Sequence, residues 1–366
     1  MARPTVIDLF CGAGGFSLGA YHAGFKVPLS VDLDRDLTSS YEINFPKSRL
    51  LITDISRLHP TTLINKARSG AETIDGIIGG PPCQGFSAIG RRDPRDPRNE
   101  LLHHFFRLVA SVRPRFFIME NVPGITAPPA KQNLDREISL LKGYDVVGPL
   151  TLDAFDFGAP TRRRRVVVIG YDPSSVEHVT EDDVRSLCDA KRRTVRDAIR
   201  DLPEPSSALS GRYRKVGKPS DYAVWARSLP PNYLGSPTAR ARTSFGIVTG
   251  IQMTRHTPEV ISRFRGVQQG ATEPISRCTR LHWNRPAPTL RAGTGPERGS
   301  FQSVRPIHPS VPRVISVREA ARLQGFPDWF DFHETKWHSF RMIGNSVSPI
   351  MAEALLKLVL CKLKKS

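Results

Sequence analysis

The sequence predicts an α/β fold: an open sheet with helices on both faces, followed by a smaller, irregular lobe. Two observations support this prediction. As far as about Tyr171, short apolar runs that suit buried strands alternate with segments of helical periodicity. From there to about His338 the alternation fades, and Pro, Arg and Ser become frequent. Because a closing helix is expected to return to the first lobe, the chain divides into residues 1–171, 172–338 and 339–366.

The amino-acid composition limits the kinds of molecule that the protein is expected to bind. The 366 residues include 53 Lys and Arg against 35 Asp and Glu, which gives a net charge of +18. This excess indicates a polyanionic partner, with nucleic acid ahead of an anionic membrane. No apolar run approaches the roughly 18 residues of a membrane-spanning helix, and we expect no signal peptide. The five cysteines form no C-x-x-C pair, so we expect neither a metal site nor a disulfide framework, and a reducing, cytoplasmic setting.

A glycine-rich loop follows the first expected strand, residues 5–9. The loop reads Phe10-Cys11-Gly12-Ala13-Gly14-Gly15-Phe16, and a helix is expected to begin near Gly15. Glycines let the backbone pass close to a ligand. The spacing matches neither the P-loop nor the dinucleotide-binding fingerprint, so taken alone it supports a nucleotide-type loop and a plain tight turn about equally.

Acidic residues follow the next two expected strands. Residues 25–31 lead into Asp32, which lies about 20 residues past the glycine loop, where an acid can accept hydrogen bonds from ribose hydroxyls. A helix is expected over residues 35–44. Residues 52–55 form another strand end and carry Asp54, which could bind an adenine amino group or cap a turn.

A cysteine motif follows the strand expected at residues 74–78. It reads Gly79-Gly80-Pro81-Pro82-Cys83-Gln84-Gly85-Phe86-Ser87. Pro cannot donate to a sheet ladder, so the strand must stop and turn, which places Cys83 just beyond the carboxyl edge of the sheet. A thiolate there would be a strong nucleophile, but many free cysteines are only small buried hydrophobes. The basic residues 88–99 are a candidate lid over this site or a solvated linker.

A carboxylate ends the fourth expected strand. Residues 116–119 lead into Glu120, after an expected helix at residues 100–112. A carboxylate at a strand end near Cys83 could act as an acid or as a hydrogen-bond acceptor toward a bound base. Taken singly, a glutamate in such a place is more often structural.

Four consecutive arginines, residues 162–165, come before a strand expected at residues 166–170. Side chains alternate along a strand, so Arg163 and Arg165 share one face and their two neighbours share the other. One pair can therefore face an anionic or carbonyl-bearing ligand while the other pair meets solvent or phosphate.

The second lobe contains one clear helix signal. Residues 316–324 are expected to form a helix, with Ser316 as its N-cap and Glu319 at the third helical position. Residues 291–300 form a Gly-rich basic loop. Residues 343–349 lead into the closing helix, which is expected to end near Leu363.

Together these segments resemble the cytosine-C5 DNA methyltransferase family. Six motifs occur in the family's order over almost the whole chain, and six in order are very specific. They are residues 8–15 for the adenosylmethionine loop, 80–87 for the nucleophile, 120–122 for the catalytic acid, Arg163 and Arg165 for the eighth motif, 318–327 for the ninth and 344–347 for the tenth.

The resemblance implies a Rossmann-like methyltransferase sheet, the cofactor S-adenosyl-L-methionine, and a cytosine flipped out of double-stranded DNA. It implies that Cys83 attacks carbon 6 of the base and that Glu120 holds and protonates the ring. Arg163 and Arg165 would hold the ring carbonyl, the cysteine loop or a phosphate. The residues implied to line the cofactor site are Phe10, Gly12, Gly14, Asp32, Asp54, Pro82, Asn345 and Ser346.

The resemblance also implies that the second lobe reads the DNA sequence in the major groove. His256, Arg277 and Arg280 are candidates, although each is more readily a structural or phosphate contact. Two positions depart from the family pattern. Leu33 stands where an aromatic residue often stacks on the adenine, and Thr161 replaces the usual glutamine before the paired arginines.

The family resemblance favours a prokaryotic, cytoplasmic, nucleoid-associated enzyme, a monomer that could be paired with a restriction endonuclease. The nearest alternative is a tRNA cytosine-5 methyltransferase. The Gly85-Phe86-Ser87 continuation favours the DNA branch, and the sequence has no Cys-Phe-Thr segment of the tRNA branch. A catalytically silent DNA-binding protein is disfavoured by the intact Cys83 and Glu120. A hydride-transferring dinucleotide enzyme explains neither Cys83 nor the charge.

Overall fold

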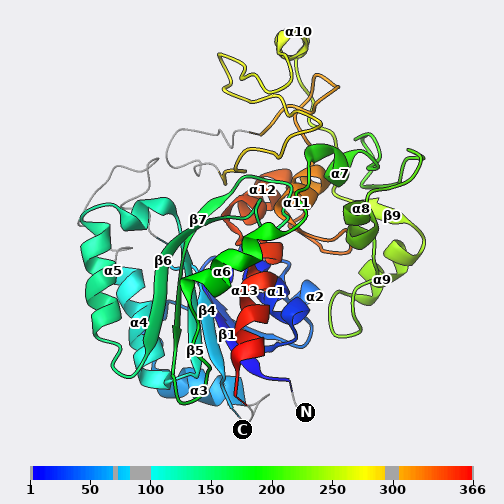
Figure 1. Cartoon of the computed structure of the whole chain (residues 1–366). Helices are drawn as coiled ribbons and strands as arrows, with labels where there is room; N and C mark the ends of the chain where they lie inside the picture. The colour runs from blue at the N-terminus through cyan, green and yellow to red at the C-terminus, as the bar shows by residue number, and fades with distance from the viewer. Residues whose placement is uncertain (1–2, 69–72, 83–99, 293–304, 365–366) are drawn as a thin grey trace.

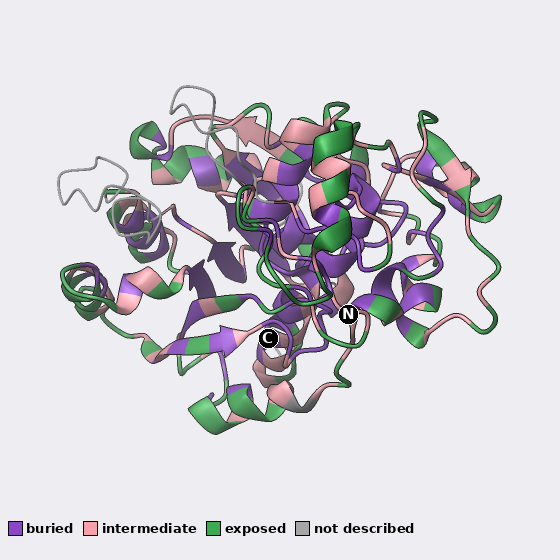
Figure 2. Ribbon diagram, turned by 90° about the horizontal axis from the view of Figure 1, so that it is seen from above, coloured by how far each residue is buried: buried purple, intermediate pink, exposed green. Residues whose placement is uncertain are grey.

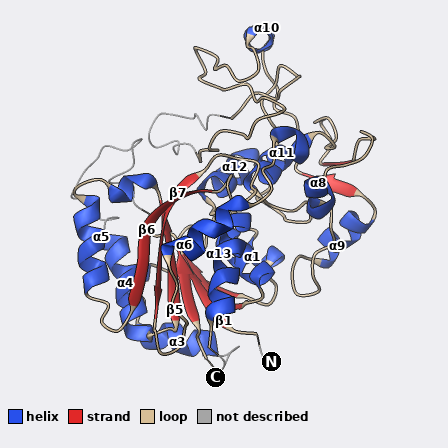
Figure 3. Cartoon of the chain, in the orientation of Figure 1, coloured by secondary structure: helices blue, strands red, loops and turns tan. Residues whose placement is uncertain are grey.

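The molecule has one sheet flanked by helices and, beyond the carboxyl edge of that sheet, a second region made largely of loops and short helices (Figures 1 and 3). The computed structural model describes residues 3–68, 73–82, 100–292 and 305–364. Cys83, the candidate lid and most of the Gly-rich basic loop lie outside the described residues.

A seven-stranded sheet forms the centre of the first lobe. Its strand order is β3-β2-β1-β4-β5-β7-β6. Neighbouring strands from β3 to β5 are parallel, and β7 runs antiparallel to both of its neighbours. The strands are β1 (Thr5–Leu9), β2 (Lys26–Asp32), β3 (Arg49–Ile52), β4 (Gly76–Gly79), β5 (Phe116–Asn121), β6 (Asp145–Asp153) and β7 (Arg164–Tyr171). The predicted α/β sheet is confirmed.

The helices of the first lobe occur between these strands. They are α1 (Gly15–Ala23), α2 (Tyr41–Asn44), α3 (Pro60–Arg68), α4 (Glu100–Val112) and α5 (Ala130–Ser139), with the 3₁₀ turns η1 (Ile55–Arg57) and η4 (Pro123–Thr126). The helix predicted over residues 35–44 is wrong except for its last turn, α2. The Asp34 carboxylate accepts hydrogen bonds from the backbone N–H of Asp36 (2.9 Å) and of Leu37 (3.0 Å), which favours turns there.

Apolar side chains alternate between the two faces of the sheet. Val6 and Phe116 belong to the core on one face, while Ile7 and Phe117 belong to the core on the other. Helices α1 and α13 (Pro349–Lys362) cover the first face, and α3, α4 and α5 cover the second. The central strands β1, β4, β5 and β7 are consequently buried along most of their length, whereas the edge strands β3 and β6 are more exposed (Figure 2).

The closing helix returns to the first lobe, as predicted, and packs on α1. A Cβ on Gly19 would lie 2.5 Å from Ala352 Cβ, so the two helices approach closely. Among the described residues, Lys336–Lys362 is the one stretch long and apolar enough, by length and composition, to cross a membrane, and most of its apolar part is buried inside the molecule. It consists of two helices, α12 (Lys336–Asn345) and α13, separated by residues 346–348.

The second region is less regular but contributes to the same core. Its elements are α6 (Glu181–Ser186), η5 (Leu187–Asp189), α7 (Val195–Ile199), β8 (Ser210–Arg212), α8 (Asp221–Ala226), α9 (Pro237–Ser244), β9 (Ile247–Thr249), α10 (Pro258–Gly266) and α11 (Val317–Gln324). Tyr222 and Trp329 join the core that also covers one sheet face. The predicted cap of α11 is confirmed, because Ser316 and Glu319 form a reciprocal capping box.

Candidate active site

The glycine loop turns sharply between β1 and α1. Phe10, Gly12 and Gly14 have positive φ angles of 60°, 50° and 89°. A Cβ on Gly14 would lie 2.3 Å from the ring of Phe45, so this position has room only for glycine. A Cβ on Gly12 would meet nothing within 4 Å. The loop therefore leaves open space at Gly12, on the edge of the sheet where ligands bind in open α/β folds.

Asp32, at the end of β2, holds this loop in place. Its Oδ2 accepts a hydrogen bond from the backbone N–H of Gly12 (2.8 Å), and its Oδ1 accepts from Leu33 (2.7 Å) and Asp34 (2.9 Å). Burial raises the pKa of the Asp32 carboxyl, although these bonds oppose the shift. A carboxylate offers about four lone-pair sites, so Asp32 can still accept a hydrogen bond from a ligand hydroxyl.

Asp54 lies just beyond β3 and caps the turn η1. Its Oδ1 accepts a hydrogen bond from the backbone N–H of Ser56 (2.9 Å), and this bond holds the pKa of the carboxyl below its usual value. Of the two roles considered for Asp54, the structure shows the cap. Contact with an adenine stays a prediction.

The turn between α12 and α13 lies against the glycine loop. A Cβ on Gly15 would lie 2.1 Å from Ser346 Oγ, so the two segments touch. Ser346 is 7% exposed, and its Oγ has no hydrogen-bond partner among the described residues. Asn345, one residue earlier, is exposed. A buried hydroxyl without a partner is uncommon, which suits contact with a polar group of a ligand.

The chain leaves β4 through a turn that Asn121 holds against the end of β5. Asn121 Nδ2 donates a hydrogen bond to the carbonyl oxygen of Pro81 (3.0 Å). A Cβ on Gly80 would lie 3.3 Å from Glu120 Oε2. The backbone that leads to Cys83 therefore passes beside the Glu120 carboxylate.

Glu120, Arg163 and Arg165 meet where β5 pairs with β7; we call them the strand-end cluster. Arg165 Nε lies 2.9 Å from Glu120 Oε1, but the contact is not aligned as a hydrogen bond, and within the described ranges that buried oxygen has none. Arg163 is 1% exposed. Its Nη1 makes a long bond of 3.5 Å to the carbonyl oxygen of Leu290, and its Nε has no partner among the described residues.

The electrostatics of the strand-end cluster favour a polar or anionic ligand. Burial, and then the charge of Arg165, lower the pKa of the Arg163 guanidinium well below its usual value, while Glu120 partly opposes the shift. Buried polar atoms normally have hydrogen-bond partners, and perturbed titratable groups gather at functional sites. The cluster therefore has the features of a site that a ligand completes.

The predicted alternation of the four arginines is confirmed. Arg163 is buried and Arg165 half-buried, whereas Arg162 and Arg164 are exposed. Asp153 of β6 supports the run, because its Oδ1 accepts a hydrogen bond from the backbone N–H of Arg163 (2.8 Å) and its Oδ2 pairs with Arg162 (3.3 Å). The strand begins at Arg164, earlier than predicted, so the second of the paired arginines lies inside it.

Thr161 links the arginine strand to the second region. It is fully buried, and its Oγ1 lies 3.3 Å from the carbonyl oxygens of both Ala287 and Pro288. This departure from the family pattern therefore has a structural role. It fastens residues 287–290 beside Arg163, which contacts the last of them.

Two of the three residues predicted as candidate base readers form structural hydrogen bonds within the second region. His256 Nε2 accepts a hydrogen bond from the backbone N–H of Val314 (3.3 Å), and burial lowers its pKa. Arg280 is 8% exposed and donates to the carbonyl oxygen of Phe264 (2.8 Å). Arg277 differs, because it is exposed and has a positive φ of 55°.

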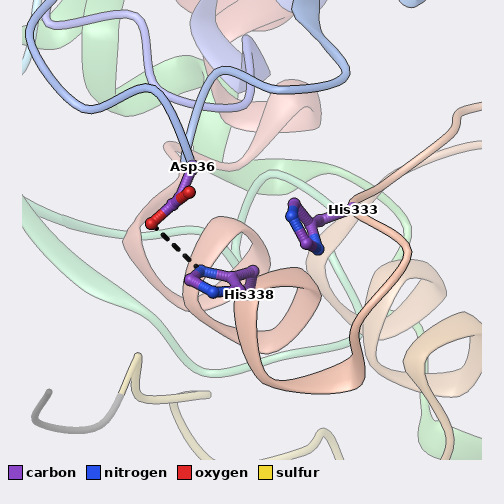
Figure 4. Close-up of side chains that lie close together, drawn as sticks. All are labelled: Asp36, His333 and His338. Atoms are coloured by element: carbon purple, nitrogen blue, oxygen red, sulfur yellow. Dashed lines mark ion pairs between the residues drawn. The ribbon is translucent and has the colours of Figure 1, made fainter. Parts of the chain in front are cut away.

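One group of side chains resembles a metal site (Figure 4). Asp36, His333 and His338 lie close together, with His338 Nδ1 3.6 Å from Asp36 Oδ2. However, His333 Nδ1 accepts a hydrogen bond from the backbone N–H of Thr335 (2.9 Å), so the neutral ring carries its proton on Nε2 and offers no free lone pair. Arg341 also lies 3.4 Å from His338. The group therefore fits a polar contact between α12 and the loop after β2.

Three polar residues that support the site were not among those predicted from the sequence. Asn121 and Asp8 lie inside the motifs at residues 120–122 and 8–15, so those motifs could have pointed to both. Asp8 is 1% exposed and accepts a hydrogen bond from Ser17 Oγ (2.5 Å), and burial raises its pKa to about 7. Asp153 gives no signal in the sequence, because its role depends on the pairing of β6 with β7.

Comparison with known proteins gives consistent matches. The family model for C-5 cytosine-specific DNA methylases matches residues 4–361. The type II methyltransferase M.XorII of Xanthomonas oryzae is 42% identical over 375 residues, which cover 100% of this chain and 86% of the relative. The type II methyltransferase M.DdeI of Desulfomicrobium norvegicum is 32% identical over 388 residues, which cover 96% and 87%.

Solved structures agree with these matches. A structure assigned as a DNA modification methyltransferase from an E. coli prophage matches with a TM-score of 0.86 and 41% identity, over 98% of this chain and 99% of that chain. The Dnmt2 methyltransferase of S. pombe shares the fold, with a TM-score of 0.57 and 19% identity over 98% of each chain.

Proposed function

This chain belongs to the C-5 cytosine-specific DNA methylase family and is a DNA cytosine-5 methyltransferase, and from that premise we propose how it acts. It transfers a methyl group from S-adenosyl-L-methionine to carbon 5 of a cytosine flipped out of duplex DNA, through a covalent adduct with Cys83. The strand-end cluster carries this proposal, because its incompletely bonded polar atoms lie beside the turn that leads to Cys83.

The residues near the glycine loop fit the cofactor, which supplies an electrophilic methyl group. Open space at Gly12 admits the ligand, Asp32 has lone pairs left for a ribose hydroxyl, and Ser346 has an unpartnered hydroxyl. Leu33, 64% exposed just after β2, offers an apolar surface to the adenine. The remaining expected contacts are Phe10, Gly14, Asp54, Pro82 and Asn345.

The cysteine supplies the nucleophile that makes carbon 5 reactive. The Cys83 thiolate forms a bond to carbon 6 of the ring, and Glu120 places a proton on the ring nitrogen so that negative charge does not accumulate. Carbon 5 then takes the methyl group. Loss of the carbon-5 proton to a base, cleavage of the bond between carbon 6 and sulfur, and return of the ring-nitrogen proton to Glu120 restore the aromatic ring, the thiolate and the acid. This step rests on the sequence motif for Cys83.

The arginines position the base and balance charge. Arg165, 2.9 Å from the Glu120 carboxylate, orients that group and reaches toward the ring carbonyl. Arg163 has its backbone held by Asp153 and its guanidinium buried with free donor capacity. A phosphate or the cysteine loop would supply the acceptors that Arg163 lacks.

The same proposal assigns roles to the parts of the chain. Residues 1–171 form the catalytic domain, residues 172–338 the target-recognition lobe, and residues 339–366 the segment that returns to the catalytic domain. The names of the bacterial relatives favour a role beside a restriction endonuclease, in the cytoplasm and near the nucleoid. We take the enzyme to act as a monomer.

Labelled S-adenosyl-L-methionine tests the proposal directly. Purified enzyme is incubated with mixed-sequence duplex DNA and, separately, with tRNA, and modified positions are mapped by bisulfite sequencing. We expect methylcytosine in a short recurring DNA motif. Label in tRNA alone would instead support the tRNA cytosine-5 methyltransferase, and the DNA assignment would be wrong.

The Cys83→Ala variant tests the covalent step. It should lose methyl transfer while keeping its affinity for duplex DNA, because the thiolate takes part in chemistry rather than in docking. Cys361→Ala, which changes an exposed cysteine on α13, is the matched control and should transfer normally. Methyl transfer by the Cys83→Ala variant would exclude the adduct.

A further inference from the structure

The second region contains a tight turn, residues 272–279, whose base is firmly anchored. Thr272 and Thr279 form an antiparallel bridge, and their hydroxyls lie 3.0 Å apart. The backbone N–H of Arg280 donates to the carbonyl oxygen of Ala271 (2.8 Å). The Arg280 guanidinium ties this base to the end of α10 through the carbonyl oxygen of Phe264 (2.8 Å). The turn therefore leaves the lobe from a fixed position.

The interior of the turn is also fixed, by a buried carboxylate. Glu273 is 2% exposed, and its Oε2 accepts a hydrogen bond from the backbone N–H of Ser276 (2.5 Å). Its backbone N–H donates to the carbonyl oxygen of Cys278 (2.9 Å), and its carbonyl oxygen accepts from the N–H of Arg277 (2.9 Å). Cys278 is buried in a small apolar cluster with Phe264. The conformation of the tip is thus determined by contacts on both sides.

The tip presents two side chains to solvent. Ile275 is 67% exposed, and Arg277 is exposed with no side-chain partner in the described parts of the chain. Arg277 has a φ of 55°, a left-handed conformation that is uncommon for a residue with a long side chain. Such strain persists where the surrounding contacts impose it, and it is often found at functional sites.

The other arginines nearby differ from Arg277. Residues 253–285 include six arginines and two glutamates, so the region is basic. Arg280 is buried in a structural bond, and Arg263 lies 3.8 Å from the Glu273 carboxylate. Arg265 is exposed on α10, where a phosphate contact would suit it. Arg277 alone among these four has a strained, anchored backbone and an unpartnered guanidinium.

We propose that this turn reads the DNA sequence, with Arg277 bonded to a guanine in the major groove and Ile275 packed on a neighbouring base edge. An arginine binds the O6 and N7 atoms of guanine with two hydrogen bonds, and apolar side chains contact the methyl group of thymine. An exposed isoleucine gains little beside a phosphate, so the pair fits a groove floor better than a backbone contact. The turn belongs to the loops around α10 that project beyond the sheet (Figure 1). This inference rests on the proposed function.

The decisive variant is Arg277→Gly. Glycine adopts a φ of 55° without strain, so the variant removes the side chain while it keeps or improves the fold. The wild-type target motif is mapped first, and kcat/KM is then measured on duplexes that carry the motif or a single changed base pair. We expect the variant to lose discrimination at one G·C position by about 5- to 150-fold and to keep it elsewhere.

Two further variants distinguish recognition of a base from electrostatic attraction to the DNA backbone. Arg265→Ala should lower kcat/KM by a similar factor on every duplex, because a phosphate contact carries no sequence information. Arg277→Lys keeps the charge but not the planar fork, so it should retain affinity and still lose part of the discrimination. Thermal melting of each variant confirms that it is folded.

The outcomes are distinct. A uniform loss on all duplexes in Arg277→Gly, or an unchanged discrimination profile, would overturn the inference and leave the proposed function intact. Failure of the wild-type enzyme to methylate any DNA would overturn both.

Discussion

Two buried arginines in this enzyme have opposite surroundings. Arg322 of α11 is 0% exposed, and each of its three guanidinium nitrogens donates hydrogen bonds, to Asp201, to Asp328 and to one backbone carbonyl. Arg163 of the strand-end cluster is 1% exposed, yet within the part of the chain that the structure describes its side chain makes one long bond and its Nε has no partner. We call Arg322, Asp201 and Asp328 the α11 network.

The pKa shifts of the two arginines differ accordingly. Burial would lower the pKa of Arg322, but the Asp328 and Asp201 carboxylates outweigh it and raise the pKa. Burial and Arg165 lower the pKa of Arg163. A buried charge whose partners are all present holds structure together, whereas a buried charge that lacks partners marks the place for a ligand. The comparison thus separates structural from functional polar groups.

The largest expected effect on stability comes from breaking the α11 network. Arg322→Met removes the ion-pair partner of the buried Asp328 carboxylate and leaves Asp201 with Arg227 alone, so we expect the free energy of unfolding to fall by about 3–5 kcal/mol. Urea unfolding measures this loss. Arg185→Met removes an exposed pair with Glu181 on α6 and should cost less than about 1 kcal/mol. Equal effects of the two variants would show that the network does not hold the second region.

Asp8 lies between these two cases, because it is buried and accepts a hydrogen bond from Ser17 but still has a raised pKa. This shift predicts that the stability of the protein depends on pH. Its pKa is about 7 in the folded protein against an ordinary value of 3.8. Between these values the folded protein holds a proton that the unfolded chain has released, so the contribution of Asp8 to stability falls as pH rises and is lost above about pH 7. The full change would be at most about 4 kcal/mol.

Asp8→Asn tests this dependence, because the amide oxygen can still accept the Ser17 hydrogen bond. Between about pH 5 and about pH 8, wild-type stability should fall relative to that of the variant. His308, whose pKa burial lowers to about 4, contributes in the opposite direction, but equally in both proteins. Parallel stability curves for the two proteins would contradict the raised pKa of Asp8.

The smallest expected effect on stability comes from Arg163→Met. The side chain lacks strong partners, and an apolar replacement of similar length also relieves a buried charge, so the free energy of unfolding should change by less than about 1 kcal/mol. Methyl transfer should nevertheless fall. Urea unfolding and kcat/KM are measured beside those of Arg322→Met. A stability loss as large as that of Arg322→Met would remove the distinction between the two arginines.

Local patterns in the sequence predicted several structural features around the site. The capping box of Ser316 and Glu319, the turn at Gly79-Gly80-Pro81-Pro82 and the alternation of the arginines depend on neighbours a few residues apart. The strand ends were less well predicted, since Glu120 and Arg165 lie inside β5 and β7 rather than beyond them. The predicted strands ended with their apolar runs, but hydrogen bonding to the neighbouring strands continues beyond those runs.

Contacts between distant segments could not be predicted. Thr161 is fixed by Ala287 and Arg163 touches Leu290, each more than one hundred residues away along the chain. The helix predicted at residues 35–44 failed because the Asp34 carboxylate forms turns there. Which buried charges find partners depends on the tertiary fold, so the distinction between Arg322 and Arg163 was not visible in the sequence.

The most direct test of the account pairs two buried glutamates. Glu120 belongs to the incompletely bonded cluster, whereas Glu319 of α11 is bound by both terminal nitrogens of Arg313 (2.9 Å each) and by the backbone N–H of Ser316 (2.6 Å). We would measure methyl transfer and the urea midpoint of Glu120→Gln and Glu319→Gln. Glu120→Gln should lose about 10²- to 10⁴-fold in transfer and keep its midpoint. Glu319→Gln should lose stability and keep transfer per folded molecule. Full transfer by Glu120→Gln would contradict the assignment of the strand-end cluster as the active site.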